Sequence, residues 1–145
     1  MVYDFDEKGV PDGADEDWRK KKTDEWLQRA QRHQQEKKST IVCGVCLPAE
    51  IKQAPHFNTS LNVHYGLIHI DDDEIKRRLE LRGWGKKNIE NNVNWAKHLE
   101  MAVKAEPEHF IVDGKINTPE QVAQKFIEWI KKEILICCYR DVLNK

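Results

Sequence analysis

The sequence lacks any long hydrophobic run, and this absence excludes several classes of protein. No segment approaches the roughly 18–20 consecutive apolar residues that a membrane-spanning helix needs. The first residues, MVYDFDEKG, have neither the basic flank nor the apolar core of a signal peptide. We therefore expect a cytoplasmic location, reduced thiols and no association with a membrane.

The chain also lacks an excess of charge of either sign. Its 145 residues include 24 Lys and Arg against 25 Asp and Glu, which leaves a net charge of -1. This balance provides no overall attraction to nucleic acid or to an anionic membrane, so we expect neither as a partner. Hydrophobic residues make up 39% and charged residues 34%, a composition typical of a folded protein. The length suits a single domain over residues 1–145.

Cysteine is scarce, and its spacing does not favour a metal site. Cys43 and Cys46 form a C-x-x-C within an expected strand, where residues three apart point to opposite faces. Cys137 and Cys138 are adjacent on an expected helix and diverge. We expect Cys43 to be a small buried hydrophobic residue. A redox role or a cysteine-ligated zinc site is the alternative.

Short apolar segments alternate with amphipathic ones along the chain. Strands are expected within residues 2–5, 39–47, 62–70 and 109–114, and helices over 15–37, 73–82, 87–104 and from 118 onward. Strands joined by helices indicate an α/β fold with three layers, in which a parallel sheet is covered on both faces. Ligands of such folds bind at the carboxyl ends of the strands, here residues 4–7, 44–48, 71–74 and 113–118.

The stretch IDDDEIKRRLELRGW places three arginines on one helix with an acidic start. Arg78 and Arg82 follow Ile75 by three and seven residues, so they share the face expected to pack inward. The guanidinium group is a planar fork of donors that matches phosphate, which makes both residues candidate anion ligands. Pairing with Glu74, four residues before Arg78, is the alternative. Arg77 lies to the side, and we expect it to pair within the helix.

A family resemblance follows from the order of these segments. RRLELRGW resembles the lid region, here about residues 73–88, of small P-loop kinases such as shikimate, adenylate and nucleoside kinases. The segments VYDFDEKGVPDGADEDWRKKKTDEWL, STIVCGVCLPAEI, NNVNWAKHLE and FIVDGKINTPEQVAQKFIEWI resemble other strands and helices of that class, in the same order. The resemblance covers nearly the whole chain. It implies a P-loop kinase-like fold and a phosphotransferase that uses ATP and Mg²⁺ on a small-molecule acceptor.

The signature G-x-x-x-x-G-K-[ST] of that class does not occur in this sequence. In the class it follows the first strand, its Lys binds the β- and γ-phosphates, and its Ser or Thr hydroxyl binds Mg²⁺. The sequence therefore resembles an N-terminally incomplete kinase domain without the first strand, which lies in the middle of the class's sheet. We expect little or no kinase activity, and exposed strand edges that favour self-association. Whether the chain is an enzyme stays open, and a non-catalytic α/β binding or interaction module is the alternative.

The resemblance assigns roles to residues that follow the first two expected strands. Asp4 and Asp6, as D-x-D at a strand end, would be catalytic, orienting the acceptor hydroxyl and holding Mg²⁺ through water. Glu7 and Gly44 would contact the substrate, with the glycine allowing close approach of the backbone. The alternatives are that the acidic residues only open a loop, and that Gly44 is needed only for packing.

The resemblance also assigns a nucleotide site in the second half of the chain. Arg78 and Arg82 would close over the phosphates of ATP. Asp113 would contact the nucleotide from the loop after the last strand. The alternative for Asp113 is that it only forms the turn.

Overall fold

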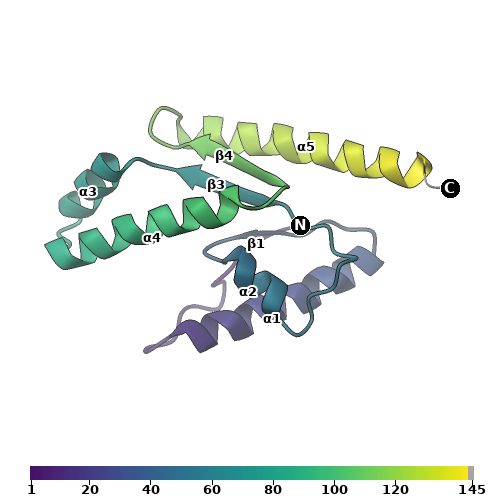
Figure 1. Cartoon of the computed structure of the whole chain (residues 1–145), viewed down its shortest axis with the longest axis horizontal. Coiled ribbons are helices and arrows are strands. Elements are labelled where there is room, and N and C mark those ends of the chain that lie inside the picture. The colour runs from purple at the N-terminus through teal and green to yellow at the C-terminus, as the bar shows by residue number, and fades with distance from the viewer. Residues whose placement is uncertain (144–145) are drawn as a thin grey trace. The chain divides into compact units, whose positions relative to one another are not determined.

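The chain folds into two compact units, Met1–Val63 and His64–Lys145. The computed structural model describes the backbone of residues 1–143 and the side chains of residues 1–133. Each unit contains one two-stranded parallel sheet together with helices (Figure 1). The structure is therefore mixed helix and strand with parallel pairing. A P-loop kinase fold and a single domain stay predictions.

Unit 1 is a strand–helix–strand arrangement followed by a short helix. The register of the two strands runs from Val2 opposite Ile41 to Asp4 opposite Cys43. The long helix begins after Asp15, whose Oδ1 accepts a hydrogen bond from the backbone N–H of Trp18. The elements are β1 (Val2–Asp4), α1 (Glu16–Gln35), β2 (Ile41–Cys43) and α2 (Pro48–Gln53).

The core of unit 1 forms where aromatic residues of β1 and the turn after it meet α1. Trp26 is only 6% exposed, and its indole N–H donates a hydrogen bond of 3.0 Å to the carbonyl of Phe5. The ring of Tyr3 lies 5.2 Å from that of Trp26. Because successive strand residues point to opposite faces, Tyr3 and Phe5 share the face toward α1.

The prediction that Cys43 is buried is wrong, because its side chain is exposed. Cys43 pairs with Asp4, and both lie on the face of the sheet opposite to that of Tyr3. Val2 of the same face is 67% exposed. The side chains of Cys137 and Cys138 lie outside the described residues.

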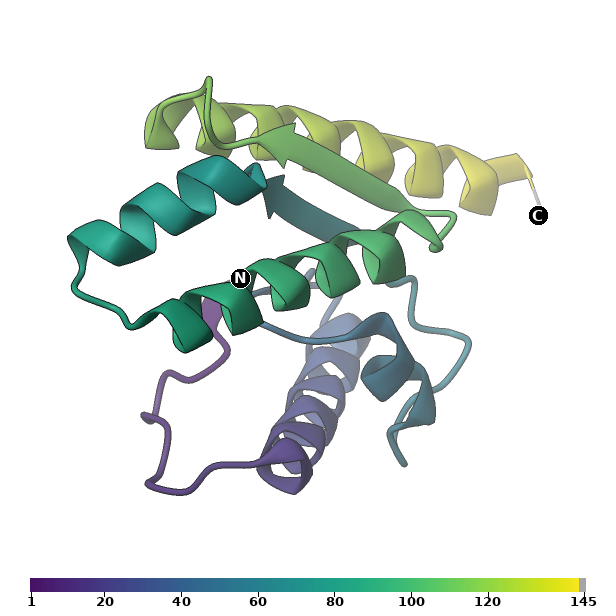
Figure 2. The same cartoon turned by 60° about the vertical axis from the view of Figure 1, so that its left-hand side comes forward.

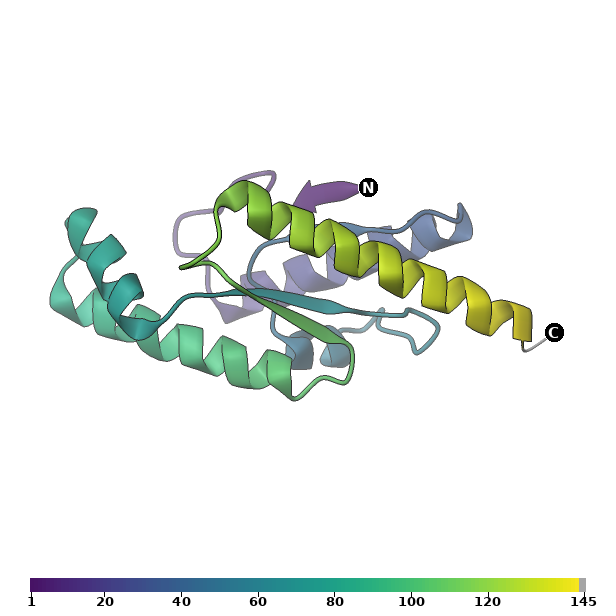
Figure 3. The ribbon, with the colours of Figure 1, turned by 90° about the horizontal axis from the view of Figure 1, so that it is seen from above.

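Unit 2 places its strands between two helices. Figures 2 and 3 show α4 and α5 on opposite faces of the strand pair. The register runs from Tyr65 opposite His109 to His69 opposite Asp113, so the carboxyl ends of both strands lie side by side. The elements are β3 (Tyr65–His69), α3 (Asp72–Leu81), α4 (Lys86–Lys104), β4 (His109–Asp113) and α5 (Pro119–Leu143).

Aromatic rings join α5 to the sheet of unit 2. The ring of Phe110 on β4 lies 5.2 Å from that of Trp129, nearly parallel, and 5.5 Å from Phe126, edge to face. Gly66 is the neighbour of Phe110 across the pair, and a Cβ there would come within 2.6 Å of the Phe126 ring. The absence of a side chain at residue 66 therefore leaves room for the Phe126 ring.

The starts of the helices in unit 2 follow the capping patterns of the sequence. Thr118 and Gln121 exchange both hydrogen bonds of a capping box, at 2.8 and 3.3 Å. At α3 only half of the box forms, since Asp71 accepts from the N–H of Glu74 while the Glu74 carboxylate binds arginines. No helix of the described residues combines the length and apolar composition needed to cross a membrane.

Candidate functional site at the carboxyl ends of β3 and β4

A ring of charged and polar groups joins the start of α3 to the turn after β4. We call Asp71, Glu74, Arg78, Gly114 and Lys115 the α3–β4 ring. The Nζ of Lys115 lies 2.6 Å from Oδ2 of Asp71, and Nε of Arg78 donates to Oε1 of Glu74 at 2.7 Å. The Nη2 of Arg78 also donates to the carbonyl of Gly114, at 3.4 Å. Two cations are thus held at adjacent strand ends.

Local sequence explains how this ring forms. The carboxylates at the start of α3 lie near the positive end of the helix dipole, and Asp71 caps the helix. After β4, Oδ1 of Asp113 accepts from the backbone N–H groups of Lys115 and Ile116, at 2.7 and 3.2 Å. This turn carries Lys115 toward α3. The carboxylate of Asp113 therefore organises the turn, and its contact with a nucleotide stays a prediction.

Hydrogen bonds keep the carboxylates of the ring ionised. The hydrogen bonds from Arg77, which is not part of the ring, and from Arg78 hold the pKa of Glu74 at about 2. The hydrogen bond from Lys115 lowers the pKa of Asp71. Each cation of the ring consequently has a carboxylate partner at neutral pH, and an incoming anion has to compete with that partner for the donors.

Arg82 lies outside the ring. It follows the last residue of α3, its backbone N–H donates to the carbonyl of Leu79, and its side chain is exposed. It makes no side-chain hydrogen bond or ion pair with the part of the chain that the structure describes. The prediction that Arg78 and Arg82 share an inward face is wrong for Arg82, because α3 ends at Leu81 and buries only Leu79. Its role toward phosphate stays a prediction.

The D-x-D residues lie together at the end of β1 in unit 1. A hydrogen bond with the side chain of Asp4 raises the pKa of Asp6, which indicates that the two carboxyl groups lie close together. Glu7 points elsewhere and forms an ion pair of 2.9 Å with Arg29 of α1. The structure thus brings the two predicted Mg²⁺ ligands together and holds Glu7 away in a contact of its own.

Gly44, the predicted substrate-side glycine, lies against the core of unit 1. Its φ is +152°, a conformation that favours glycine. A Cβ at this position would lie 2.3 Å from Cβ of Phe5. Packing against Phe5 therefore explains the glycine, and a contact with substrate stays a prediction.

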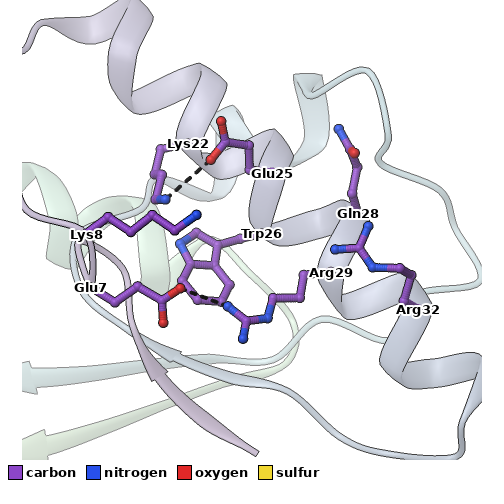
Figure 4. A pocket seen from close by; sticks show the side chains of 8 residues that line it. All are labelled: Glu7, Lys8, Lys22, Glu25, Trp26, Gln28, Arg29 and Arg32. Carbon is purple, nitrogen blue, oxygen red and sulfur yellow. Dashed lines mark hydrogen bonds and ion pairs between the residues drawn. The ribbon is translucent and has the colours of Figure 1, made fainter.

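A hollow of about 460 Å³ lies between α1 and the turn after β1, and sequence reasoning missed it. Figure 4 shows its lining, with Trp26 between the cations and with the ion pairs Glu7–Arg29 and Lys22–Glu25. The spacing of three or four residues along α1 is the sequence signal that groups these side chains. The full lining is Glu7, Lys8, Lys22, Glu25, Trp26, Gln28, Arg29 and Arg32.

Sequence reasoning also missed Lys115. Its signal is a Gly-Lys pair directly after an expected strand, where ligand-contacting residues of α/β folds lie.

No family model, curated protein or solved structure matches the chain.

Proposed function

We propose that this chain is a nucleotide-dependent phosphotransferase of the small P-loop kinase class, impaired by the lack of the phosphate-loop motif, and that the α3–β4 ring binds nucleotide phosphate. The observation that carries the proposal is the Arg78 guanidinium, which reaches the Gly114 carbonyl at the end of β4. Its planar fork of donors suits phosphate oxygens. Lys115 adds a second cation at the same strand ends.

The pairing of the strands supports the class. In P-loop kinases the strand before the phosphate loop lies in the middle of a parallel sheet, and the remaining strands flank it. Without that strand the sheet would divide into separate parallel pairs. Among the residues that the structure describes, β1 pairs only with β2 and β3 only with β4, each pair parallel and joined through helices.

The chemistry proposed for the residues present is positioning and neutralisation of charge. Within unit 2, Arg78 and Lys115 contact the phosphates of the nucleotide. Asp4 and Asp6 of unit 1 keep their predicted role, in which they hold Mg²⁺ through water and orient an acceptor hydroxyl. The sequence contains no G-x-x-x-x-G-K-[ST], so the backbone donors and the lysine of that loop are missing from the set. We therefore expect weak nucleotide binding and little hydrolysis by these residues alone.

A titration with ATP in the presence of Mg²⁺ tests the proposal, with Arg77→Ala as matched control for Arg78→Ala. Both arginines donate to Glu74, but only Arg78 reaches Gly114. We expect Arg78→Ala to weaken binding by roughly tenfold, the value of one charge-assisted hydrogen bond, and Arg77→Ala to change it less than about twofold. Equal effects of the two substitutions would contradict the proposed site. Robust ATP hydrolysis would contradict the expected impairment.

A non-catalytic binding or interaction module is the second candidate. It is favoured by the carboxylate partners of Arg78 and Lys115, which leave neither cation free to bind an anion without competition. For this candidate we expect no nucleotide binding by the folded chain at millimolar ATP, and no difference among the arginine variants. Circular dichroism of each variant provides the control for folding.

A further inference from the structure

Three metal-ligating side chains converge at the amino ends of β3 and β4, the opposite end of the pair from the α3–β4 ring. A ring nitrogen of His64 and carboxylate oxygens of Glu108 and Glu133 lie within 4.8 Å of one another. His64 directly precedes β3 and Glu108 directly precedes β4, so parallel pairing places them side by side. The N–H of Tyr65 donates to the carbonyl of Glu108 at 2.9 Å and holds this arrangement.

Packing of α5 supplies the third ligand. The ring of Trp129 lies 6.0 Å from that of His64, edge to face, and orients the imidazole. Glu133 follows Trp129 by four residues and so lies on the same face of the helix. The ligand set is therefore positioned by one strand pair and one packed helix within unit 2.

These polar groups have no compensating partners among the described residues. The Nδ1 of His64 is buried and has no hydrogen-bond partner there. The carboxylates of Glu108 and Glu133 make no hydrogen bond or ion pair with a described residue. Two carboxylates held close together without a cation repel each other, and a buried ring nitrogen without a partner is unfavourable. A bound divalent cation would satisfy all three groups.

We propose that His64, Glu108 and Glu133 bind a divalent transition-metal ion, with zinc as the metal to test first. One imidazole and two carboxylates are ligands that zinc and its neighbours accept, whereas Mg²⁺ and Ca²⁺ favour all-oxygen sites. The ligand atoms of a tetrahedral zinc ion lie roughly 3.3 Å apart. Rotation of the glutamate side chains would bring the three ligand atoms, which lie within 4.8 Å of one another, to that spacing. Three protein ligands leave a coordination position for water. This site is independent of the proposed nucleotide chemistry.

Titration of the full chain with Zn²⁺, against a chromophoric chelator, tests the site. We expect one equivalent to bind, and Glu108→Gln and Glu133→Gln each to weaken the affinity by tenfold or more. The matched control is Glu120→Gln in the first turn of the same helix α5, which should leave the affinity unchanged. Thermal unfolding provides a second readout, since zinc should raise the Tm of the unsubstituted protein and of Glu120→Gln, but not that of the other two.

Cobalt substitution separates this site from a cysteine-ligated one. We expect a Co²⁺ spectrum without the charge-transfer bands of thiolate ligands. A spectrum with those bands would overturn the proposal. So would equal zinc affinities for the three glutamate variants, or no zinc binding by protein that unfolds cooperatively in the presence of a chelator.

Discussion

The carboxylate of Glu50 on α2 receives the guanidinium fork of Arg19 on α1. Nη2 of Arg19 lies 2.6 Å from Oε1, and Nε donates to Oε1 and Oε2 at 2.9 and 3.0 Å. Oε2 also accepts from the backbone N–H of Leu47, which precedes α2. The side chain of Glu50 is only 7% exposed. A carboxylate buried to this degree depends on its partner, and the pair joins α2 to α1.

Arg19→Met should destabilise unit 1 by about 3 kcal/mol, the lower end of the cost of leaving a buried charge without its partner. The lower end applies because a quarter of the Arg19 side chain is exposed. Lys20→Met is the control, since its partner Glu16 is on the surface and such pairs contribute about 0–1 kcal/mol. Urea unfolding monitored by tryptophan fluorescence measures both. Equal losses in the free energy of unfolding for the two substitutions would contradict the importance of Glu50 burial.

Gly44→Ala should lower the stability of unit 1 by about 1–3 kcal/mol, because the new methyl group collides with Phe5 and the backbone conformation favours glycine. Gly85→Ala is the control, since a Cβ there meets no atom within 4 Å and the φ is -72°. Thermal unfolding measures the two Tm values. Loss of substrate binding by Gly44→Ala at unchanged Tm would instead support a direct contact with substrate.

The pKa of Glu74 makes a contribution to stability that depends on pH. Because Arg77 and Arg78 lower this pKa from 4.5 to about 2, the folded state is stabilised above pH 4.5, and the contribution is lost as pH falls toward 2. Glu74→Gln should therefore be less stable than the unsubstituted protein at neutral pH, with a difference that shrinks in acid. Glu80→Gln, an exposed position of the same helix, is the control. Urea unfolding at several pH values tests this, and a constant difference for Glu74→Gln would contradict it.

The two cysteines of the C-x-x-C should differ in reactivity. Burial raises the pKa of Cys46, whereas Cys43 is exposed, and thiolates are the reactive species. Iodoacetamide should therefore modify Cys46 more slowly than Cys43, by roughly tenfold or more. Peptide mapping by mass spectrometry measures each rate, and repeating the reaction in urea should remove the difference. Equal rates in the native protein would contradict the burial of Cys46.

Much of the local structure was predictable because its signals are close in sequence. The acidic start of α3 and the capping box of Thr118 and Gln121 are patterns of three or four residues, and both helices begin where these patterns lie. For Arg78 the sequence left pairing with Glu74 and binding of an anion as alternatives. The structure shows the pairing with Glu74 and, in addition, a hydrogen bond from Nη2 to the Gly114 carbonyl, while binding of an anion stays a prediction.

The predictions for Cys43 and Arg82 were wrong because periodicity alone does not say which face is covered. An apolar strand indicates burial only if both faces of its sheet are packed, and Cys43 lies on the exposed face. The residues of a helical stripe face inward only over the length of the helix, and α3 ends at Leu81. In each case the outcome depends on neighbouring elements that a local pattern does not contain.

The sequence by itself determined, to within a residue, where the four longer helices begin, since caps, turns and apolar periodicity act over a few residues. It also indicated the strands, although β2 and β3 are shorter than expected. It also determined the absence of the phosphate-loop motif. Only the tertiary structure decided that Lys115 meets Asp71, that Arg19 meets Glu50 and that His64, Glu108 and Glu133 converge. These contacts join residues far apart in the chain, and parallel strand pairing and helix packing, not local propensity, bring them together.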